Sequence, residues 1–180
     1  MVLSEMKIKS SDELVDRLTK LTNSIRADKK LSWSLNSGGC AFFAARVAKV
    51  AGLNVLGLSV FDDGERSQEI FPKVLSESNS SKKNQTVAFW NDNGIHFNHV
   101  VVKFLVKGRV MFYDGIHGIM DEATCVRKFR DYAYGEEVGV APVELIMPLT
   151  KNQRGWNPAF RSRAEVARLI KGHLQDKWNS

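Results

Sequence analysis

The chain has 180 residues, 43% of them hydrophobic and 26% charged, and its 26 Lys and Arg against 20 Asp and Glu give a formal net charge of +6. This length and composition fit one globular domain, residues 1–180, with a core of its own, and exclude a wholly disordered chain, a collagen-like repeat and a coiled coil. The positive charge is compatible with an acidic partner or nucleic acid, but no run of five or six like charges points to either.

Two helices are predicted in the first third of the chain. Ser10 begins a capping-box pattern ahead of apolar residues at helical spacing, which predicts an amphipathic helix that ends near Asp28. Residues 33–39 hold Ser, Asn and Gly and predict turns. Residues 40–51 are apolar on nearly every side and stop at Gly52, so we expect a buried, central helix there.

The rest of the chain is rich in β-branched and aromatic residues, in short runs separated by turn residues. Strands are predicted at residues 55–61, 86–90, 98–106, 109–114 and 143–149, and helices at residues 121–132 and 159–178. The stretch that ends at Leu75 is ambiguous because Pro72 interrupts it. This order predicts an α+β domain, in which the central helix packs on a mostly antiparallel sheet beside a C-terminal helix.

Cys40 opens the predicted central helix and follows two glycines. The positive end of the helix dipole favours the thiolate form of a cysteine at this position. Gly38 and Gly39 leave room for a second backbone near the sulfur, and they leave amide N–H groups free to stabilise an oxyanion. Most free cysteines are small buried apolar residues, so Cys40 indicates a nucleophile only together with a suitable base.

The predicted hairpin brings a histidine and a carboxylate together. Lys107-Gly108 is typical of a two-residue turn, which sets Val106 opposite Arg109 and so determines the register of the two strands. In this register His99 and Asp114 lie diagonally on one face, roughly 7–8 Å apart at the backbone, within reach of an imidazole–carboxylate hydrogen bond. Such a pair also occurs as a purely structural hydrogen bond, and the order Cys, His, Asp along the chain favours the catalytic interpretation.

Other potentially reactive side chains are expected to be structural. His96 points to the face opposite that of His99, and His117 does not face Asp114. Cys125 has basic neighbours but no histidine–carboxylate pair that can be assigned to it. The spacing of the cysteines and histidines matches no zinc-binding pattern, so we expect neither a metal nor another cofactor.

Cys40, His99 and Asp114 are the residue types of a catalytic triad: a nucleophile, a base that also protonates the leaving group, and a carboxylate that orients the base. Gly38-Gly39-Cys40 before a helix, His99 at the start of a strand and Tyr113-Asp114-Gly115 on its hairpin partner resemble the transglutaminase-like and papain-like cysteine superfamily. Arylamine acetyltransferases and small bacterial or phage-encoded cysteine peptidases share this arrangement. The resemblance spans residues 35–118.

This resemblance implies a cysteine hydrolase or acyltransferase that acts on an amide or thioester bond of a protein or peptide. Peptidase, deamidase and transglutaminase-type chemistry are all open. Papain-like enzymes complete the oxyanion hole with a Gln several residues before the cysteine. This chain has no Gln there, so the side chains of Asn36 and Trp33 are the candidate donors.

A second hypothesis is a binding protein with the same fold and no chemistry, which holds an acidic partner or nucleic acid through the basic side of the C-terminal helix. The basic residues in question are Arg161, Arg163, Arg168 and Lys171. Only two cysteines occur, and neither a secretion signal nor a bilayer-spanning apolar run is recognisable. We therefore expect a cytoplasmic protein that does not enter a membrane.

Overall fold

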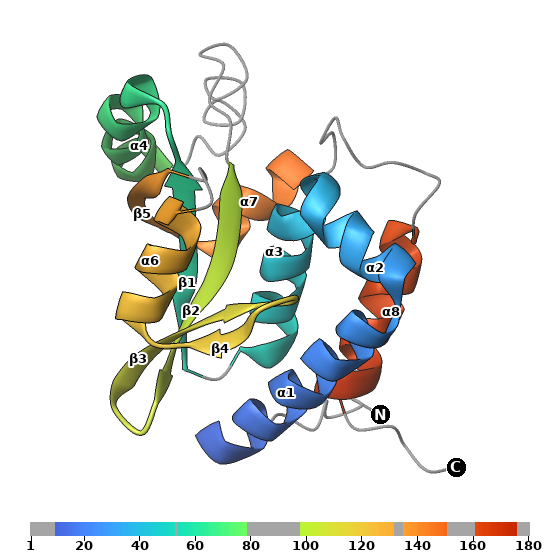
Figure 1. The fold of residues 1–180 in the computed structure, drawn as a ribbon. Coiled ribbons are helices and arrows are strands. Elements are labelled where there is room, and N and C mark those ends of the chain that lie inside the picture. Colours follow the sequence, from blue (N-terminus) through green and yellow to red (C-terminus); the bar gives the residue numbers. More distant parts are fainter. Residues whose placement is uncertain (1–9, 53, 79–97, 132–134, 151–160, 176–180) are drawn as a thin grey trace, which may run out of the picture.

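The computed structural model describes residues 10–52, 54–78, 98–131, 135–150 and 161–175. Within them the chain forms an α+β fold on an open, five-stranded antiparallel sheet of strand order β4-β3-β2-β1-β5 (Figure 1). The strands are β1 (Val55–Asp62), β2 (His99–Val106), β3 (Arg109–Asp114), β4 (Gly118–Met120) and β5 (Glu136–Ala141). The α+β class predicted from the sequence is confirmed.

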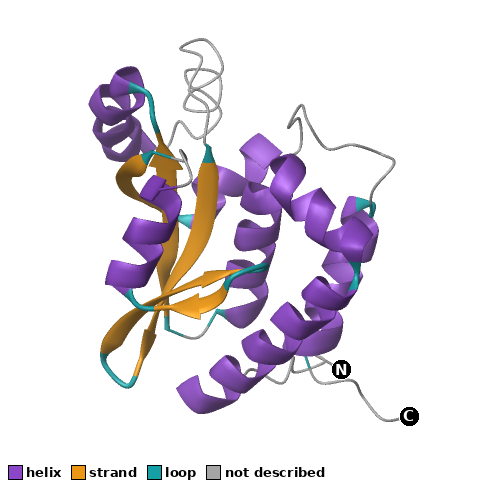
Figure 2. Cartoon of the chain, in the orientation of Figure 1, coloured by secondary structure: helices purple, strands orange, loops and turns teal. Residues whose placement is uncertain are grey.

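Helices flank this sheet on both faces (Figure 2). They are α1 (Ser11–Ala27), α2 (Lys29–Ser34), α3 (Cys40–Ala51), α4 (Glu65–Ser78), α6 (Glu122–Asp131), α7 (Val143–Leu149) and α8 (Arg163–Leu174). Helix α3 packs against β2 and also against α7 and α8, while α1 contacts α8 and β4. Helix α6 contacts β3 and β5 and covers the other face (Figure 1).

Alternate residues of the central strands point into two separate cores, as the two-residue period of a strand requires. Val100 and Val102 of β2 belong to the larger core, which they share with α1, α3 and α8. Val101 and Phe112 belong to the smaller core, where they meet Phe129 of α6. The predicted central helix is therefore buried between the sheet and other helices.

The first helix forms as its sequence predicts. The Ser10 side chain accepts a hydrogen bond from the backbone N–H of Glu13 at 3.2 Å and caps the N-terminus of α1. The apolar side of α1 is buried, with Leu14, Leu18, Leu21 and Ile25 at most 1% exposed. The helix ends at Ala27, one residue before the predicted end.

Helix α3 has the bounds that the apolar run predicted, Cys40–Ala51, and it ends at Gly52 with a φ of 59°. The region before it is less simple than the predicted turns. Helix α2 continues to Ser34 and a kinked helical segment, Leu35–Gly39, follows. The kink needs the positive φ of Gly38, 92°, which an L-residue with a side chain rarely adopts.

The hairpin between β2 and β3 has the predicted two-residue turn. Lys107 and Gly108 have φ angles of 49° and 77°, and both positive values match the twist of the flanking strands. Val106 pairs with Arg109, as the predicted register requires. The register of the strands that carry His99 and Asp114 is therefore confirmed.

The predicted strand at residues 143–149 is wrong, because this segment forms α7. A short apolar run does not distinguish a strand from a buried helix by its periodicity. Pro142 starts the first turn, where its carbonyl accepts from the N–H of Leu145 at 3.1 Å. The strand in this region is β5, which pairs with β1. Two of the six residues of β5 are glutamates and one is a glycine, and these residue types rarely form strands. The pairing with β1, and not the intrinsic preference of its residues, therefore makes this segment a strand.

The remaining predicted elements differ mainly in extent. The ambiguous stretch before Leu75 belongs to α4, which contains Pro72. Helix α6 lies within the predicted range, and the predicted strand at residues 86–90 lies outside the described residues. The C-terminal helix begins at Arg163, where Ser162 forms a capping box, and not at residue 159. None of the helices in the described ranges has the length and apolar character to cross a membrane.

The fold predicts that Gly115, the residue after Asp114, tolerates no side chain. A Cβ at this position would lie 2.7 Å from the Phe43 ring and 2.8 Å from Leu35 Cδ1. We expect Gly115→Ala to lower the free energy of unfolding by about 1–3 kcal/mol, the usual cost of overpacking a core.

Urea denaturation measures this change, and Gly172→Ala on α8 is the matched control. A Cβ added at Gly172 would have no neighbour within 4 Å, so this variant should be neutral or more stable by up to about 1 kcal/mol, as for Gly to Ala in a helix. Equal effects of the two substitutions would contradict the close contact at Gly115.

Candidate active site

The three residues of the predicted triad converge where three elements begin or end. Cys40 is the first residue of α3, His99 the first of β2 and Asp114 the last of β3. His99 Nε2 lies 2.9 Å from Asp114 Oδ2, in a hydrogen bond between two buried side chains. His99 is 6% exposed and Asp114 is 7% exposed, so almost no water competes for this bond.

The Cys40 side chain is also within hydrogen-bonding range of His99. Since Nε2 is bonded to Asp114, Nδ1 is the nitrogen that remains for the sulfur. Cys40 is partly exposed, whereas the other two residues are buried. One imidazole therefore connects an accessible thiol with a buried carboxylate.

The charged forms of His99 and Asp114 stabilise each other. Burial of the imidazole opposes its protonation, but the hydrogen bonds and negative charges of Asp114 and Cys40 outweigh this and raise the pKa of His99 to about 10. Burial also raises the pKa of Asp114, and the hydrogen bond to His99 with its charge outweighs that and holds the pKa below its ordinary value. The pair is thus an imidazolium and a carboxylate at neutral pH.

A tight turn holds the carboxylate in place. Asp114 Oδ1 accepts hydrogen bonds from the backbone N–H groups of Ile116 at 2.9 Å and His117 at 2.8 Å. These two bonds and the bond to His99 satisfy both carboxylate oxygens. An Asp that hydrogen-bonds the backbone two and three residues ahead is a common start of a turn, and this signal is visible in the sequence.

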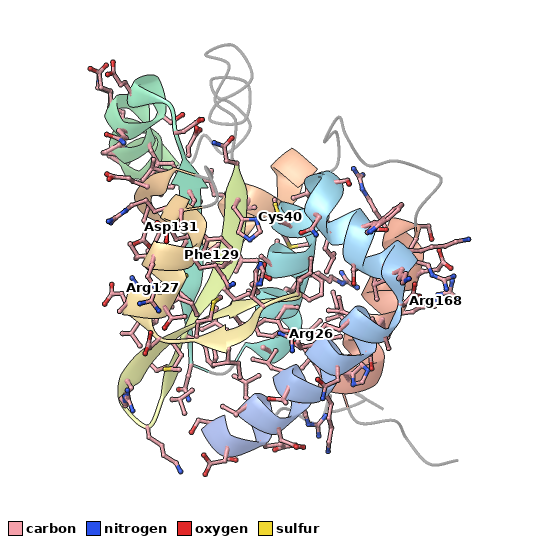
Figure 3. The ribbon with its side chains drawn as sticks, viewed as in Figure 1. Arg26, Cys40, Arg127, Phe129, Asp131 and Arg168 are labelled. Atoms are coloured by element: carbon pink, nitrogen blue, oxygen red, sulfur yellow. The ribbon has the colours of Figure 1, made fainter. Side chains whose placement is uncertain are left out.

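Phe129 of α6 packs on the imidazole, with the ring centroids 4.4 Å apart. Figure 3 shows Phe129 and Cys40 on the two helices that lie on either side of β2. Because His99 is the first residue of its strand, its ring lies at the end of the sheet and can contact elements from both faces. Sequence reasoning missed Phe129, whose helical spacing marks it only as a core residue.

The two predicted oxyanion donors lie shortly before the nucleophile along the chain. Trp33 is 60% exposed on α2, and Asn36 is exposed in the kinked segment. The backbone N–H groups at the start of α3 lie at this same end of the helix, just after the kink at Gly38, and are further candidate donors. The candidate donors are therefore two exposed side chains and the first backbone amides of the helix.

The other cysteine and the other histidines near the site were expected to be structural. Cys125 is fully buried, and burial followed by the charge of Glu137 raises its pKa to about 12. His117 gives its backbone N–H to Asp114, while its ring packs edge-on against Phe129. His96 lies outside the described residues.

The basic residues at the start of the C-terminal helix and just before it have partners within the chain. Arg161 forms ion pairs with Asp28 at 2.9 Å and with Glu165 at 3.1 Å. Arg163 lies over the ring of Phe42, with its guanidinium carbon 5.9 Å from the ring centroid. Arg168 and Lys171 are exposed.

One groove of the described chain lies away from these three residues, at the other end of α3. This groove of about 410 Å³ is lined by apolar residues such as Val55, Leu56 and Met147 and lies at the C-terminal end of α3. Cys40 is at the N-terminal end of that helix. Among the described residues, no three His, Cys, Asp or Glu side chains gather as they would around a metal ion.

No family model, no curated protein and no solved structure matches the chain. The chemistry of the site is therefore inferred from the geometry of its residues.

The raised pKa of His99 predicts how stability depends on pH. A group whose pKa is higher in the folded chain stabilises it fully below the unfolded pKa of about 6.5 and loses this effect as the pH rises through about 10. Between about pH 7 and pH 10, the free energy of unfolding of the wild-type chain should therefore fall relative to that of His99→Gln. Denaturant titrations at a series of pH values measure the difference.

His117→Gln is the control for this experiment. Burial lowers the pKa of His117, so its neutral form is already favoured and its removal should leave the alkaline decline in place. If His99→Gln lost stability as steeply as the wild type over this range, His99 would not be the group that titrates.

Proposed function

We propose that this protein is a cysteine hydrolase or acyltransferase that acts on an amide or thioester bond through Cys40, His99 and Asp114. The observation that carries the proposal is a single buried imidazole in contact with both a partly exposed thiol at a helix N-terminus and a buried carboxylate. A purely structural histidine–carboxylate pair has no need of an accessible thiol on its other nitrogen. The proposal includes a papain-like or transglutaminase-like arrangement of these elements.

In the proposed reaction, the Cys40 sulfur attacks the carbonyl carbon of the substrate while His99 holds the thiol proton as an imidazolium. The negative charge that develops on the carbonyl oxygen is met by N–H groups at the start of α3, with Asn36 or Trp33 as a second donor. The tetrahedral intermediate then collapses, and the imidazolium gives its proton to the leaving amine or thiol. The product of this half-reaction is a thioester on Cys40.

The second half-reaction releases the acyl group. His99, now neutral, takes a proton from water or from an acyl acceptor, whose oxygen or nitrogen attacks the thioester and restores the thiol. Water gives hydrolysis and an amine gives acyl transfer. Asp114 keeps the imidazole in the same orientation in both steps and stabilises its charged form.

The substrates proposed are proteins or peptides, in the reducing cytoplasm that the cysteine content favours. No metal or other cofactor takes part in the proposed steps, because the thiol, the imidazole and the backbone N–H groups supply the nucleophile, the acid–base group and the oxyanion donors.

The triad predicts a definite order of severity among variants. With p-nitrophenyl acetate as an activated acyl donor, the wild-type chain should acquire one acetyl group on Cys40 and release it slowly, which intact-mass and peptide mass spectrometry follow. Cys40→Ala should abolish acylation, and His99→Ala should be nearly as damaging, because the sulfur loses its base. Asp114→Asn keeps the shape of the carboxylate and should lose about 10²–10⁴-fold in rate, by analogy with other triads.

His173→Ala is the control, since its ring contacts Ser24 at 3.0 Å where α8 meets α1, and it should retain the wild-type rate. A Cys40 that accepts no acetyl group and reacts with iodoacetamide no faster than a free thiol would favour the second hypothesis, a binding protein. In that case the exposed Arg168 and Lys171 would be the place to look for an acidic partner or nucleic acid.

A further inference from the structure

Arg26, near the end of α1, contacts the turn that carries Asp114. Its Nε donates to the backbone carbonyl oxygen of Ile116 at 2.7 Å, and its Nη2 donates to that of His117 at 3.2 Å. The planar guanidinium suits this task, because its donors lie in a rigid fork that can reach two adjacent oxygens. Ile116 is 90 residues further along the chain, so the contact is a product of the tertiary fold.

One peptide group links the guanidinium to the catalytic carboxylate. The peptide between Ile116 and His117 accepts from Arg26 at its carbonyl oxygen and donates from its N–H to Asp114 Oδ1 at 2.8 Å. Hydrogen bonds in such a chain polarise one another, so a cation at the carbonyl end strengthens the bond at the N–H end. The carboxylate is thereby held and stabilised from the side opposite to His99.

We infer that Arg26 is a positioning residue for the triad, which acts through the Gly115–His117 turn to keep Asp114 Oδ2 on His99. This inference rests on the proposed function, because the position of Asp114 affects the reactivity of the thiol only if Cys40 and His99 act as a nucleophile and its base. The alternative role is a simple attachment of α1 to the sheet. An attachment would affect stability but would not affect the chemistry of the thiol.

The charged groups around this turn come from several elements. The imidazole of His99 on β2 bonds directly to Asp114, and the Cys40 side chain on α3 contacts that imidazole. Lys128 on α6 and Arg26 both oppose protonation of the His117 ring. Arg26 is bonded to the backbone of the turn itself.

The test is the pH dependence of alkylation at Cys40. Iodoacetamide modification of the full-length chain is followed by peptide mass spectrometry, with the fully buried Cys125 as an internal reference. In Arg26→Gln, Asp114 should hold the imidazolium less firmly in place beside the Cys40 sulfur, so the imidazolium stabilises the thiolate less and the thiol loses its proton at a higher pH. The acid limb of the profile should shift upward by about half a unit to one unit, which is a loss of about three- to tenfold in rate near pH 6 with little change at about pH 9.5.

Two further variants separate the effect of position from that of charge. Arg26→Lys keeps the charge but cannot present the two-pronged fork, so it should shift the limb in the same direction by a smaller amount. Arg168→Gln makes the same chemical change on α8, where the Nε of Arg168 lies 3.4 Å from the carbonyl oxygen of Ala164 in its own helix, and its profile should match the wild type. Figure 3 shows the two arginines on different helices, with Arg26 on the helix that lies beside the strands.

A lower melting temperature of both Arg26 variants with an unchanged alkylation profile would overturn the inference and leave Arg26 as a structural attachment. If Arg26→Gln does not fold, a wild-type profile in Arg26→Lys would overturn it equally. The His99→Ala variant separates a failure of the role inferred for Arg26 from a failure of the proposed function. A changed profile in His99→Ala but not in Arg26→Gln overturns the role of Arg26 alone, whereas an unchanged profile in His99→Ala overturns the proposed function as well.

Discussion

The site depends on one carboxylate, that of Asp114, which stays ionised inside the protein. A charged group that is only 7% exposed has lost most of its hydration, and only directed hydrogen bonds can offset that loss. Two backbone N–H groups bond to Oδ1, and the imidazole of His99 bonds to Oδ2. Each donor is itself fixed, the N–H groups by a tight turn and the imidazole by its packing on Phe129.

The second requirement is a close approach between α3 and that turn. Gly115 meets Phe43 and Leu35 without a side chain of its own, so the turn comes as near to the helix as a backbone allows. Buried alanines along α3 keep the helix close to its neighbours over its whole length. Because its N-terminus lies at the site, the positive end of the helix dipole is at the sulfur of Cys40.

The three residues differ in exposure in a way that suits an acyl-transfer reaction. The thiol is partly accessible, while the base and its carboxylate are shielded, so a substrate would meet the sulfur before it could reach either charged partner. The groove at the other end of α3 is too far along the helix to contribute, since its residue Ala48 is eight positions, or about 12 Å of helical rise, from Cys40. Part of the candidate basic surface is already paired within the chain, because Arg161 forms ion pairs with two carboxylates.

The sequence by itself determined the features that depend on neighbouring residues. Gly52 ends α3 as predicted, and the Lys107-Gly108 turn sets the register that places His99 diagonal to Asp114, because caps and two-residue turns are decided within a few residues. Only the tertiary structure decided which apolar segment joined the sheet: residues 143–149 became a helix, and the glutamate-containing β5 became the strand. It alone brought Arg26 to the Asp114 turn and Phe129 to the imidazole, since such contacts depend on how whole elements pack and leave no signal in the local pattern.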